Sequence, residues 1–197
     1  MTSRSSLPVV TLVRHGATEW SRCGKHTGLT DLPLLAEGEE DAIRLAPILA
    51  PDKFDLVATS PLVRARETCR LAGFGDVARI DPDLTEWDYG DYEGRTTAEI
   101  RADRPGWQLF RDGCPGGEQA ADVAARADRV IATLRRSGGN ALLFSSGHLL
   151  RVLAARWLGL APQAGALFTL GTASISQLGY DHDRTEPAIR RWNLTAA

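Results

Sequence analysis

The sequence predicts an α/β domain built around a mostly parallel β-sheet. Short, uniformly apolar runs that are typical of buried strands alternate along the chain with longer stretches that have helical periodicity. Parallel strands need a crossover connection, which is usually a helix, so this alternation indicates successive strand–helix–strand units. The length of 197 residues suits one domain with a sizeable core, and we expect residues 1–197 to form it.

The elements of the first half follow from apolar runs and their boundaries. Pro51 ends one helical stripe, Ser60-Pro61 resembles an N-cap followed by proline at the first helical position, and Gly73 is a helix stop. In order, we expect a strand at 7–13, a helix at 38–50, a strand at 54–58, a helix from 60 to 73 and a strand at 77–80.

The second half begins with a long irregular stretch and then returns to the same alternation. The run ALLFS is typical of a buried strand, and Ser137-Gly138-Gly139 ends the helix before it. In order, we expect short helices at 97–104 and 107–111, a helix at 118–136, a strand at 141–145, a helix at 147–158, and strands at 172–180 and 189–192 as an antiparallel edge pair.

Composition limits the function classes. A net charge of −2 marks neither a nucleic-acid partner nor a membrane-surface partner, and no apolar stretch is long enough for a membrane helix. No secretory signal pattern is visible at the start. Cys23, Cys69 and Cys114 are odd in number and unrelated in spacing, which argues against a disulfide framework. We therefore expect a cytoplasmic protein; the sequence leaves its oligomeric state open, a homodimer included.

Charged residues gather where the predicted strands end. The first strand is followed by Arg14 and His15, the second leads to Arg64, the third to Glu86, and the fourth to His148. In open α/β sheets, ligands bind outside the carboxyl ends of the strands. The sequence therefore predicts one crevice for a small phosphorylated ligand, in which Gly16 would let the anion approach the backbone closely.

These residue types suit phosphoryl chemistry. Arginine presents a planar fork of donors that matches phosphate oxygens, and helix N-termini add free N–H groups. Two nearby guanidinium groups disfavour a protonated imidazole, so a histidine between them stays neutral and nucleophilic. A second histidine, if cationic, would stabilise the transition state, and a glutamic acid could protonate the leaving alkoxide. No metal is needed where arginines stabilise the charge.

Four segments together resemble the histidine phosphatase superfamily. They are RHGATEW, SPLVRARETC, LTEWDYGDYEG and SSGHLLR, and they occur in the expected order between about Val9 and Ile175. The resemblance is to the metal-independent branch that includes cofactor-dependent phosphoglycerate mutase, and it is closest to actinobacterial acid phosphatases and fungal sedoheptulose-bisphosphatase-like enzymes. It implies a phosphoglycerate mutase-like, three-layer α/β/α fold.

The resemblance also assigns roles by position. His15 matches the histidine that becomes phosphorylated, and Glu86 matches the acid that protonates the leaving group and then activates water. Arg14, Arg64 and His148 match the phosphate pocket. The substrate-binding residues that it implies are Arg14, Ser21, Thr27, Gly28, Arg64, Tyr89, His148 and Leu149. It implies a phosphomonoester hydrolase of small phosphorylated metabolites that uses no metal and no cofactor.

Three positions depart from the family pattern, which usually has Glu at Ala17, Asn at Ser21 and Arg at Lys25. The Asn touches the phosphate, so we expect Ser21 to keep a weaker or water-mediated contact. The chain also lacks the longer segments that mutases place around the active site, which favours a phosphatase because water can then enter. A mutase, or an inactive protein that binds a phosphorylated ligand, remains the alternative.

Other polar clusters have ordinary interpretations. The acidic residues around Glu86 lack the regular spacing of a cation site. Asp181-His182-Asp183 reads as a polar hairpin turn between the last two strands, with a metal site as the alternative. Glu118 simply starts the long helix. Lys25, His26 and the stretch 96–117 are the candidates for setting the substrate, while Trp107 and Phe110 form either an apolar wall above the site or plain core.

Overall fold

The structure, a computed structural model, describes residues 7–195 and contains a single six-stranded sheet. The strands are β1 (Val10–Arg14), β2 (Leu56–Thr59), β3 (Arg79–Ile80), β4 (Ala141–Ser145), β5 (Ser174–Tyr180) and β6 (Pro187–Thr195). Their order across the sheet is β3-β2-β4-β1-β5-β6. The first four strands run parallel, and β5 and β6 add an antiparallel edge, as the sequence predicted.

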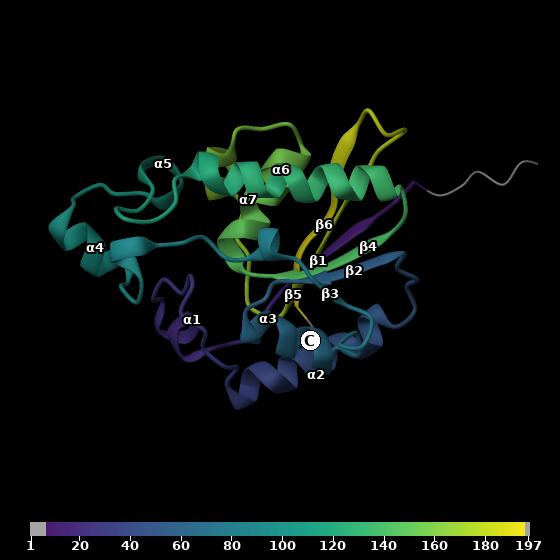
Figure 1. Ribbon diagram of the computed structural model, residues 1–197, viewed down its shortest axis with the longest axis horizontal. Coiled ribbons are helices and arrows are strands. Elements are labelled where there is room, and N and C mark those ends of the chain that lie inside the picture. The colour runs from purple at the N-terminus through teal and green to yellow at the C-terminus, as the bar shows by residue number, and fades with distance from the viewer. Residues whose placement is uncertain (1–6, 196–197) are drawn as a thin grey trace, which may run out of the picture.

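Helices cover both faces of the sheet, so the predicted three-layer α/β/α architecture is confirmed (Figure 1). On one face lie α2 (Ala36–Leu49) and α3 (Val63–Leu71). On the other lie α6 (Ala120–Ser137) and α7 (Gly147–Trp157). The short helices project beyond one end of the sheet and are α1 (Glu19–Cys23), α4 (Thr97–Asp103) and α5 (Leu109–Asp112). Three 3₁₀ turns are η1 (Pro82–Leu84), η2 (Gly90–Tyr92) and η3 (Pro162–Leu167).

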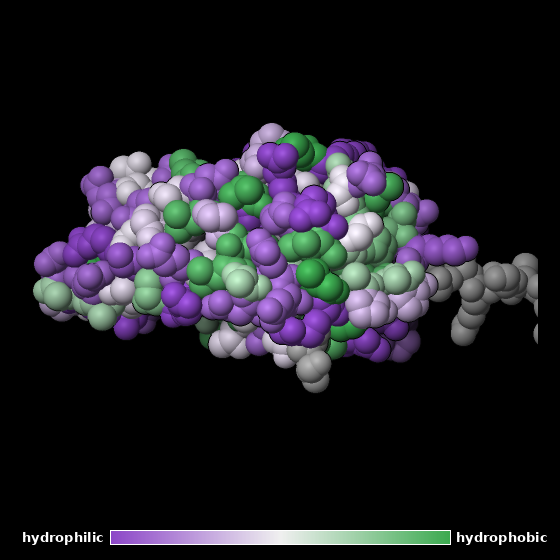
Figure 2. Space-filling model, turned by 90° about the horizontal axis from the view of Figure 1, so that it is seen from below, coloured by the Kyte–Doolittle hydropathy of each residue, from purple (hydrophilic) through white to green (hydrophobic). Residues whose placement is uncertain are grey.

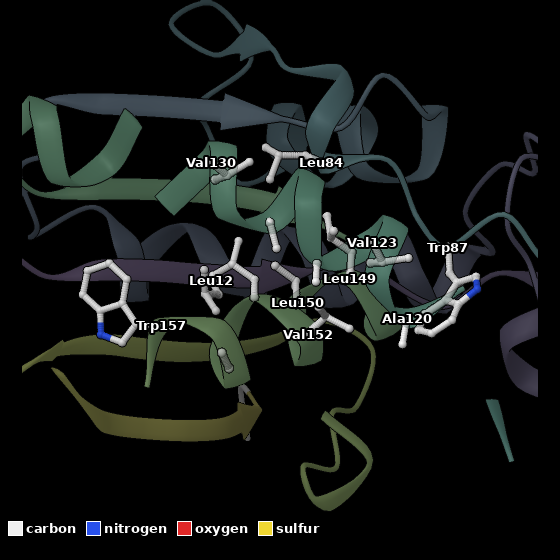
Figure 3. Close-up of a cluster of buried hydrophobic side chains, with 14 of the residues drawn as sticks. Leu12, Leu84, Trp87, Ala120, Val123, Val130, Leu149, Leu150, Val152 and Trp157 are labelled. Atoms are coloured by element: carbon white, nitrogen blue, oxygen red, sulfur yellow. The ribbon is translucent and has the colours of Figure 1, made fainter. Parts of the chain in front are cut away.

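The core has two parts, one on each face of the sheet. Leu12 of β1 belongs to the larger part, packed with α6 and α7, and its neighbour Val13 belongs to the smaller part against α2 and α3. A strand buried on both faces explains why this run is continuously apolar rather than alternating. Figure 3 shows the larger part, with Trp157 and Trp87 at opposite ends of the cluster.

Several local predictions differ from the structure; the strand expected at 77–80, for example, comprises only Arg79–Ile80. The helix expected from residue 60 begins at Val63, because the hydroxyl of Ser60 accepts the N–H of Leu62 at 3.3 Å and holds a turn before the helix. Helix α1 was not predicted. Its start is fixed by a capping box in which Thr18 and Ser21 each accept the backbone N–H of the other.

The side of the molecule that carries α2 and α3 has a mixed surface among the described residues (Figure 2). There, hydrophobic residues lie in small groups between hydrophilic ones (Figure 2). The large exposed hydrophobic residues of α2 are Ile43 and Ile48. Within residues 7–195, none of the helices combines the length and apolar character needed to cross a membrane.

Candidate active site

Polar side chains from separate segments line one cavity outside the carboxyl ends of β1 and β4. These strands are paired in register, Arg14 beside Ser145, and the N–H of His15 continues the ladder by donating to the carbonyl of Ser145 at 3.0 Å. The side chains of His15 and His148 therefore arise from adjacent strand ends. The lining also includes Glu86 and Tyr89, which come from the segment between β3 and α6.

His15 is held as a neutral base. Its Nδ1 lies 2.7 Å from the carbonyl oxygen of Gly16, and because a carbonyl only accepts, Nδ1 carries the proton and Nε2 keeps its lone pair. Burial lowers the pKa of His15 well below its usual value, and the charges of Arg14 and Arg64 lower it further. The imidazole thus presents a nucleophilic nitrogen, as expected for a histidine between two guanidinium groups.

The glycine that follows His15 has a different neighbour from the one expected. A Cβ at position 16 would stand 2.3 Å from the carbonyl oxygen of Gly38 in α2. The close approach at Gly16 is therefore made by the backbone of α2, and Gly16 packs the loop against that helix.

The two arginines of the predicted pocket occupy different positions. Arg14 lines the cavity, where one terminal nitrogen donates to the carbonyl of Leu170. Arg64 is fully buried and lies outside the lining. In both residues the Nε–H group is buried without a hydrogen-bond partner among the described residues, although buried polar groups are nearly always paired. Arg14, which lines the cavity, thus keeps a donor that an added anion could use.

Arg64 organises the loop that contains Thr27 and Gly28. Its guanidinium donates to the carbonyls of Thr27 at 3.0 Å, Gly28 at 2.8 Å and Thr30 at 3.0 Å. From the opposite side, Glu93 accepts the N–H groups of Gly28 and Thr30 at 2.8 and 3.2 Å. The loop is fixed between a buried cation and a carboxylate, and Thr27 is the member that reaches the cavity lining.

Glu86 is bound at the N-terminus of α7. Its Oε1 accepts the N–H groups of Trp87 and Leu149 at 2.9 and 2.8 Å, and Oε2 accepts the N–H of His148 at 2.9 Å. The carboxylate thus occupies two N–H groups of the first turn of α7, so these helix N-terminal donors are not free to bind a phosphate. Oε2 accepts only one of these bonds and retains a lone pair for a proton.

The segment that carries Glu86 is fixed by a pair that sequence reasoning missed. Arg126 of α6 donates to the carbonyls of Asp83 at 2.9 Å and Thr85 at 2.8 Å, and it pairs with Glu118 at 2.8 Å. Glu118 also accepts the N–H of Asp88 at 2.9 Å. Glu118 therefore does not start the helix, which is capped by the next residue; it ties the Glu86 segment to α6.

His148 is paired with Tyr89 at 2.5 Å between Nδ1 and the phenolic oxygen. The phenol is buried and donates to no other described residue, so it donates to Nδ1, which leaves the proton of the imidazole on Nε2. Burial lowers the pKa of His148 well below its usual value, and nearby Arg151, His26 and Arg14 add to this. His148 is thus a neutral N–H donor, whereas the sequence analysis considered a cationic one.

The structure brings most of the predicted site residues into the lining. These are Arg14, His15, Ser21, Thr27, Glu86, Tyr89 and His148, whereas Arg64, Gly28 and Leu149 lie outside it. Leu149 contributes only its backbone N–H, to Glu86. The hydroxyl of Ser21 accepts the N–H of Thr18 at 2.8 Å and donates to its carbonyl at 3.0 Å, so its only proton is engaged within the cap of α1.

Aromatic residues surround the side of the cavity near His148. His26 lines the cavity, its ring centroid is 4.8 Å from that of Tyr89, and burial lowers its pKa to about 4. Trp107 and Phe110 are buried in the core, where the indole N–H of Trp107 donates to the carbonyl of Gly113 at 2.9 Å. Both also border a neighbouring cavity, so they combine the two roles considered for them.

The segment Asp181-His182-Asp183 lies in the turn between β5 and β6, as predicted. His182 Nδ1 lies 2.8 Å from Glu186 and 3.2 Å from Asp181, and all three are exposed. Among residues 7–195, this is the one cluster of three potential metal-ligating side chains close enough to share an ion. It belongs to the hairpin and is separate from the cavity.

The chain belongs to the histidine phosphatase superfamily (branch 1), whose profile matches residues 10–195. It is 38% identical over 182 residues to an acid phosphatase of Mycobacterium tuberculosis (strain ATCC 25618 / H37Rv), covering 90% of this chain and 89% of the relative. It is 40% identical over 192 residues to sedoheptulose 1,7-bisphosphatase of Saccharomyces cerevisiae, covering 81% and 70%. The resemblance inferred from the four sequence segments is thereby confirmed.

A solved structure and a mutase complete the comparison. The product of open reading frame Rv3214 from Mycobacterium tuberculosis superimposes with a TM-score of 0.91 at 36% identity, over 96% of this chain and 99% of that one. A probable phosphoglycerate mutase of Enterobacter sp. (strain 638) is 31% identical over 181 residues, covering 87% and 84%. The fold is therefore phosphoglycerate mutase-like, and the similar proteins include both phosphatases and a probable mutase.

Proposed function

We propose that this protein hydrolyses phosphomonoesters of small metabolites through a phosphohistidine at His15, without a metal ion. The observation that carries the proposal is the state of His15: a buried, neutral imidazole whose Nε2 lone pair is fixed by the Nδ1–H bond to Gly16, in a cavity shared with Arg14 and Glu86. A neutral imidazole nitrogen is the form that can attack phosphorus.

The proposed reaction has two steps. The lone pair of His15 Nε2 attacks phosphorus, the bond from phosphorus to the ester oxygen breaks, and Glu86 donates its proton to the departing alkoxide. Water then attacks the phosphohistidine and gives its proton to Glu86, while the electron pair of the N–P bond returns to Nε2. Phosphate leaves, and both residues are restored.

The remaining polar groups would stabilise charge in the transition state. Arg14 keeps an unpartnered Nε–H, and His148 keeps Nε2–H because Tyr89 occupies its Nδ1. Donors that are fixed before the reaction need no reorganisation, and losing one typically costs about 10²–10³ in rate. The hydroxyl of Ser21 is a weaker candidate than the sequence suggested, because its proton already serves Thr18.

The direct test is trapping the intermediate. Purified protein should release phosphate from an aryl phosphate, and rapid quenching at alkaline pH should give a phosphoryl-protein whose label maps to the peptide with His15. His15→Ala should do neither. Equal rates for the two proteins would defeat the proposal. A loss of wild-type activity in a chelator would also defeat it, because the proposal has Arg14, and not a metal ion, stabilise the charge of the phosphoryl group.

The mutase alternative differs in the fate of the phosphoryl group. If the protein is a hydrolase, the trapped phosphoenzyme should decay in buffer at the rate of turnover. If it is a mutase, the phosphoenzyme should persist in water and transfer its phosphate when a phosphorylated glycerate or sugar is added. Following the labelled phosphoenzyme with and without such an acceptor separates the two.

A further inference from the structure

The tautomer of the His15 imidazole depends on the carbonyl of a glycine. The carbonyl oxygen of Gly16 accepts the Nδ1–H group at 2.7 Å, and this bond leaves Nε2 with its lone pair. Glycine has more backbone freedom than any other residue, so Gly16 does not by itself fix the direction of this carbonyl. Contacts from outside the segment must therefore hold the Gly16 backbone in place.

The backbone of residues 15–17 is held from several sides. Backbone hydrogen bonds join the carbonyl or N–H groups of this segment to other parts of the chain, namely Ser145, Ala173 and Leu35. The N–H of Gly16 instead donates to the hydroxyl of Thr68 at 3.0 Å. Apart from the ring of His15 itself, Thr68 is the one side chain that hydrogen-bonds to the backbone of residues 15–17 within the part of the chain that the structure describes.

The hydroxyl of Thr68 is oriented for this contact. Thr68 lies on α3, is fully buried, and donates to the carbonyl of Arg64 one turn earlier at 2.7 Å. Because a hydroxyl carries one proton, this bond turns a lone pair of Oγ1 toward the N–H of Gly16. A threonine in a helix can bond to the carbonyl four residues earlier without any further role. Here, however, the same hydroxyl also pairs a buried backbone N–H that has no other partner among residues 7–195.

The segment cannot replace this contact with a stiffer residue of its own. A Cβ at position 16 would stand 2.3 Å from the carbonyl oxygen of Gly38 in α2, so only glycine fits there. The freedom that glycine brings is therefore removed from outside, by the backbone of α2 on one side and by the hydroxyl on α3 on the other. Helix α3 thus serves the cavity twice, because the guanidinium of Arg64 also holds the loop of Thr27.

We infer that Thr68 is a positioning residue for His15: its hydroxyl fixes the backbone of Gly16, whose carbonyl keeps the imidazole proton on Nδ1 and so presents the lone pair of Nε2 to phosphorus. Thr68 does not line the cavity, so it acts only through Gly16 and His15. The attack on phosphorus rests on the proposed function, whereas the position of the imidazole proton does not depend on it.

The first test follows the imidazole of His15 by ¹⁵N NMR at pH 7.5, with its signals assigned by their absence in His15→Ala. In the wild type, Nδ1 should have the shift of a protonated nitrogen and Nε2 that of an unprotonated one. Thr68→Val keeps the shape of the side chain and removes the hydroxyl, so the proton should be divided between the two nitrogens and their shifts should approach each other. Thr68→Ser, which keeps the hydroxyl, should give the wild-type shifts.

The second test measures the rate constant of phosphoenzyme formation from 4-nitrophenyl phosphate by rapid quenching. In Thr68→Val this rate constant should fall about 10- to 100-fold, because a small misplacement of a reacting group is costly. KM should change little, since Arg14 is untouched, and Thr68→Ser should stay near the wild type.

The matched control for both tests is Thr133→Val on α6. The hydroxyl of Thr133 donates to the carbonyl of Arg129 four residues earlier at 3.1 Å, as that of Thr68 does to Arg64, but Thr133 lies outside the cavity lining. This variant should keep both the shifts of His15 and the rate.

Unchanged shifts and rates in Thr68→Val would overturn the inference. An equal loss in Thr68→Ser would overturn it as well, because the effect would then come from packing and not from the hydroxyl. The wild type gives a check that needs no variant: the amide proton of Gly16 should exchange slowly with solvent, and exchange as fast as in an unfolded peptide would contradict the assigned bond.

The inference and the proposed function can fail separately. If the imidazole proton moves in Thr68→Val while the wild type releases no phosphate, the hydrolase is rejected and the positioning role is retained. If the wild type releases phosphate through His15 while the proton stays on Nδ1 in Thr68→Val, the hydrolase is retained and the positioning role is rejected.

Discussion

The floor of the cavity and its wall are built in different ways. The floor, formed by Arg14, His15 and His148 at the ends of β1 and β4, is positioned by strand pairing and by the start of α7. The wall, residues 81–119, contains only 3₁₀ turns and short helices, and side-chain bonds such as those of Arg126 hold it in place. The difference teaches that His15, the proposed nucleophile, depends on the sheet for its position, whereas Glu86, the proposed acid, depends on single side chains outside the cavity.

The largest effect is expected from removing His15, the proposed nucleophile on the floor of the cavity. His15→Ala should lower kcat for an aryl phosphate by about 10⁴-fold or more, the typical cost of losing a covalent catalyst. The thermal midpoint should change little in comparison, since the strand pairing remains. Residual activity within tenfold of the wild type would show that another group attacks phosphorus.

The wall should fail selectively when its anchor is removed. Arg126→Met breaks a largely buried pair with Glu118 and frees the carbonyls of Asp83 and Thr85, so Glu86 should lose its position. We expect kcat to fall about 10- to 100-fold for alkyl phosphates and much less for 4-nitrophenyl phosphate, whose good leaving group needs little protonation.

The matched control for this variant is Arg129→Met, on the same helix. Arg129 pairs with Asp83 at the surface, where ion pairs contribute about 0–1 kcal/mol, so activity on both esters should stay near the wild type. An equal loss on alkyl and aryl esters in Arg126→Met would mean that the anchor supports the whole cavity and not Glu86 in particular.

A smaller effect should come from the contact between wall and floor. Tyr89→Phe removes the donor to His148 Nδ1, so the proton of the imidazole is no longer confined to Nε2. We expect kcat to fall about tenfold, the equivalent of one hydrogen bond, with little change in KM. An unchanged kcat would show that His148 keeps its tautomer without Tyr89.

For pH, the smallest effect on activity is expected at the floor. Because the pKa of His15 lies well below its usual 6.5, kcat/KM should show no loss from this residue as pH falls through about 6.5. A drop in kcat/KM centred near pH 6.5 that persists when the other histidines are replaced would assign an ordinary pKa to His15.

Stability should respond to pH even where activity does not. His15, His26 and His148 stay neutral in the fold, while the unfolded chain protonates them below about 6.5. The contribution of these groups to the free energy of unfolding should therefore be full above that pH and fall as the pH drops. For His26, whose pKa in the fold is about 4, the loss between pH 6.5 and 4 is about 3 kcal/mol. Urea unfolding at pH 7.5 and 5 measures this. His26→Gln should reduce the loss, whereas His182→Gln, on the exposed hairpin, should not.

The floor and the wall also differed in how well they could be predicted. The strands, the covering helices and the edge pair follow from the periodicity of apolar residues, and the side chains at strand ends follow from the geometry of parallel sheets. The wall, in contrast, lacks a regular spacing of apolar residues from which its structure could be predicted. Arg126 lies 40 residues after Glu86 in the chain, in a helix whose pattern shows only that it is amphipathic.

By itself, the sequence determined the α/β architecture, the family and the segments that would supply the cavity, because strand and helix patterns are local properties of the chain. Only the tertiary structure decided which atoms face the cavity. It bonded Arg64 to the loop of Thr27, bound Glu86 to the start of α7 and left Arg151 without a carboxylate oxygen within 4.0 Å among residues 7–195. Those outcomes depend on hydrogen bonds between residues far apart in the chain, and no local pattern encodes them.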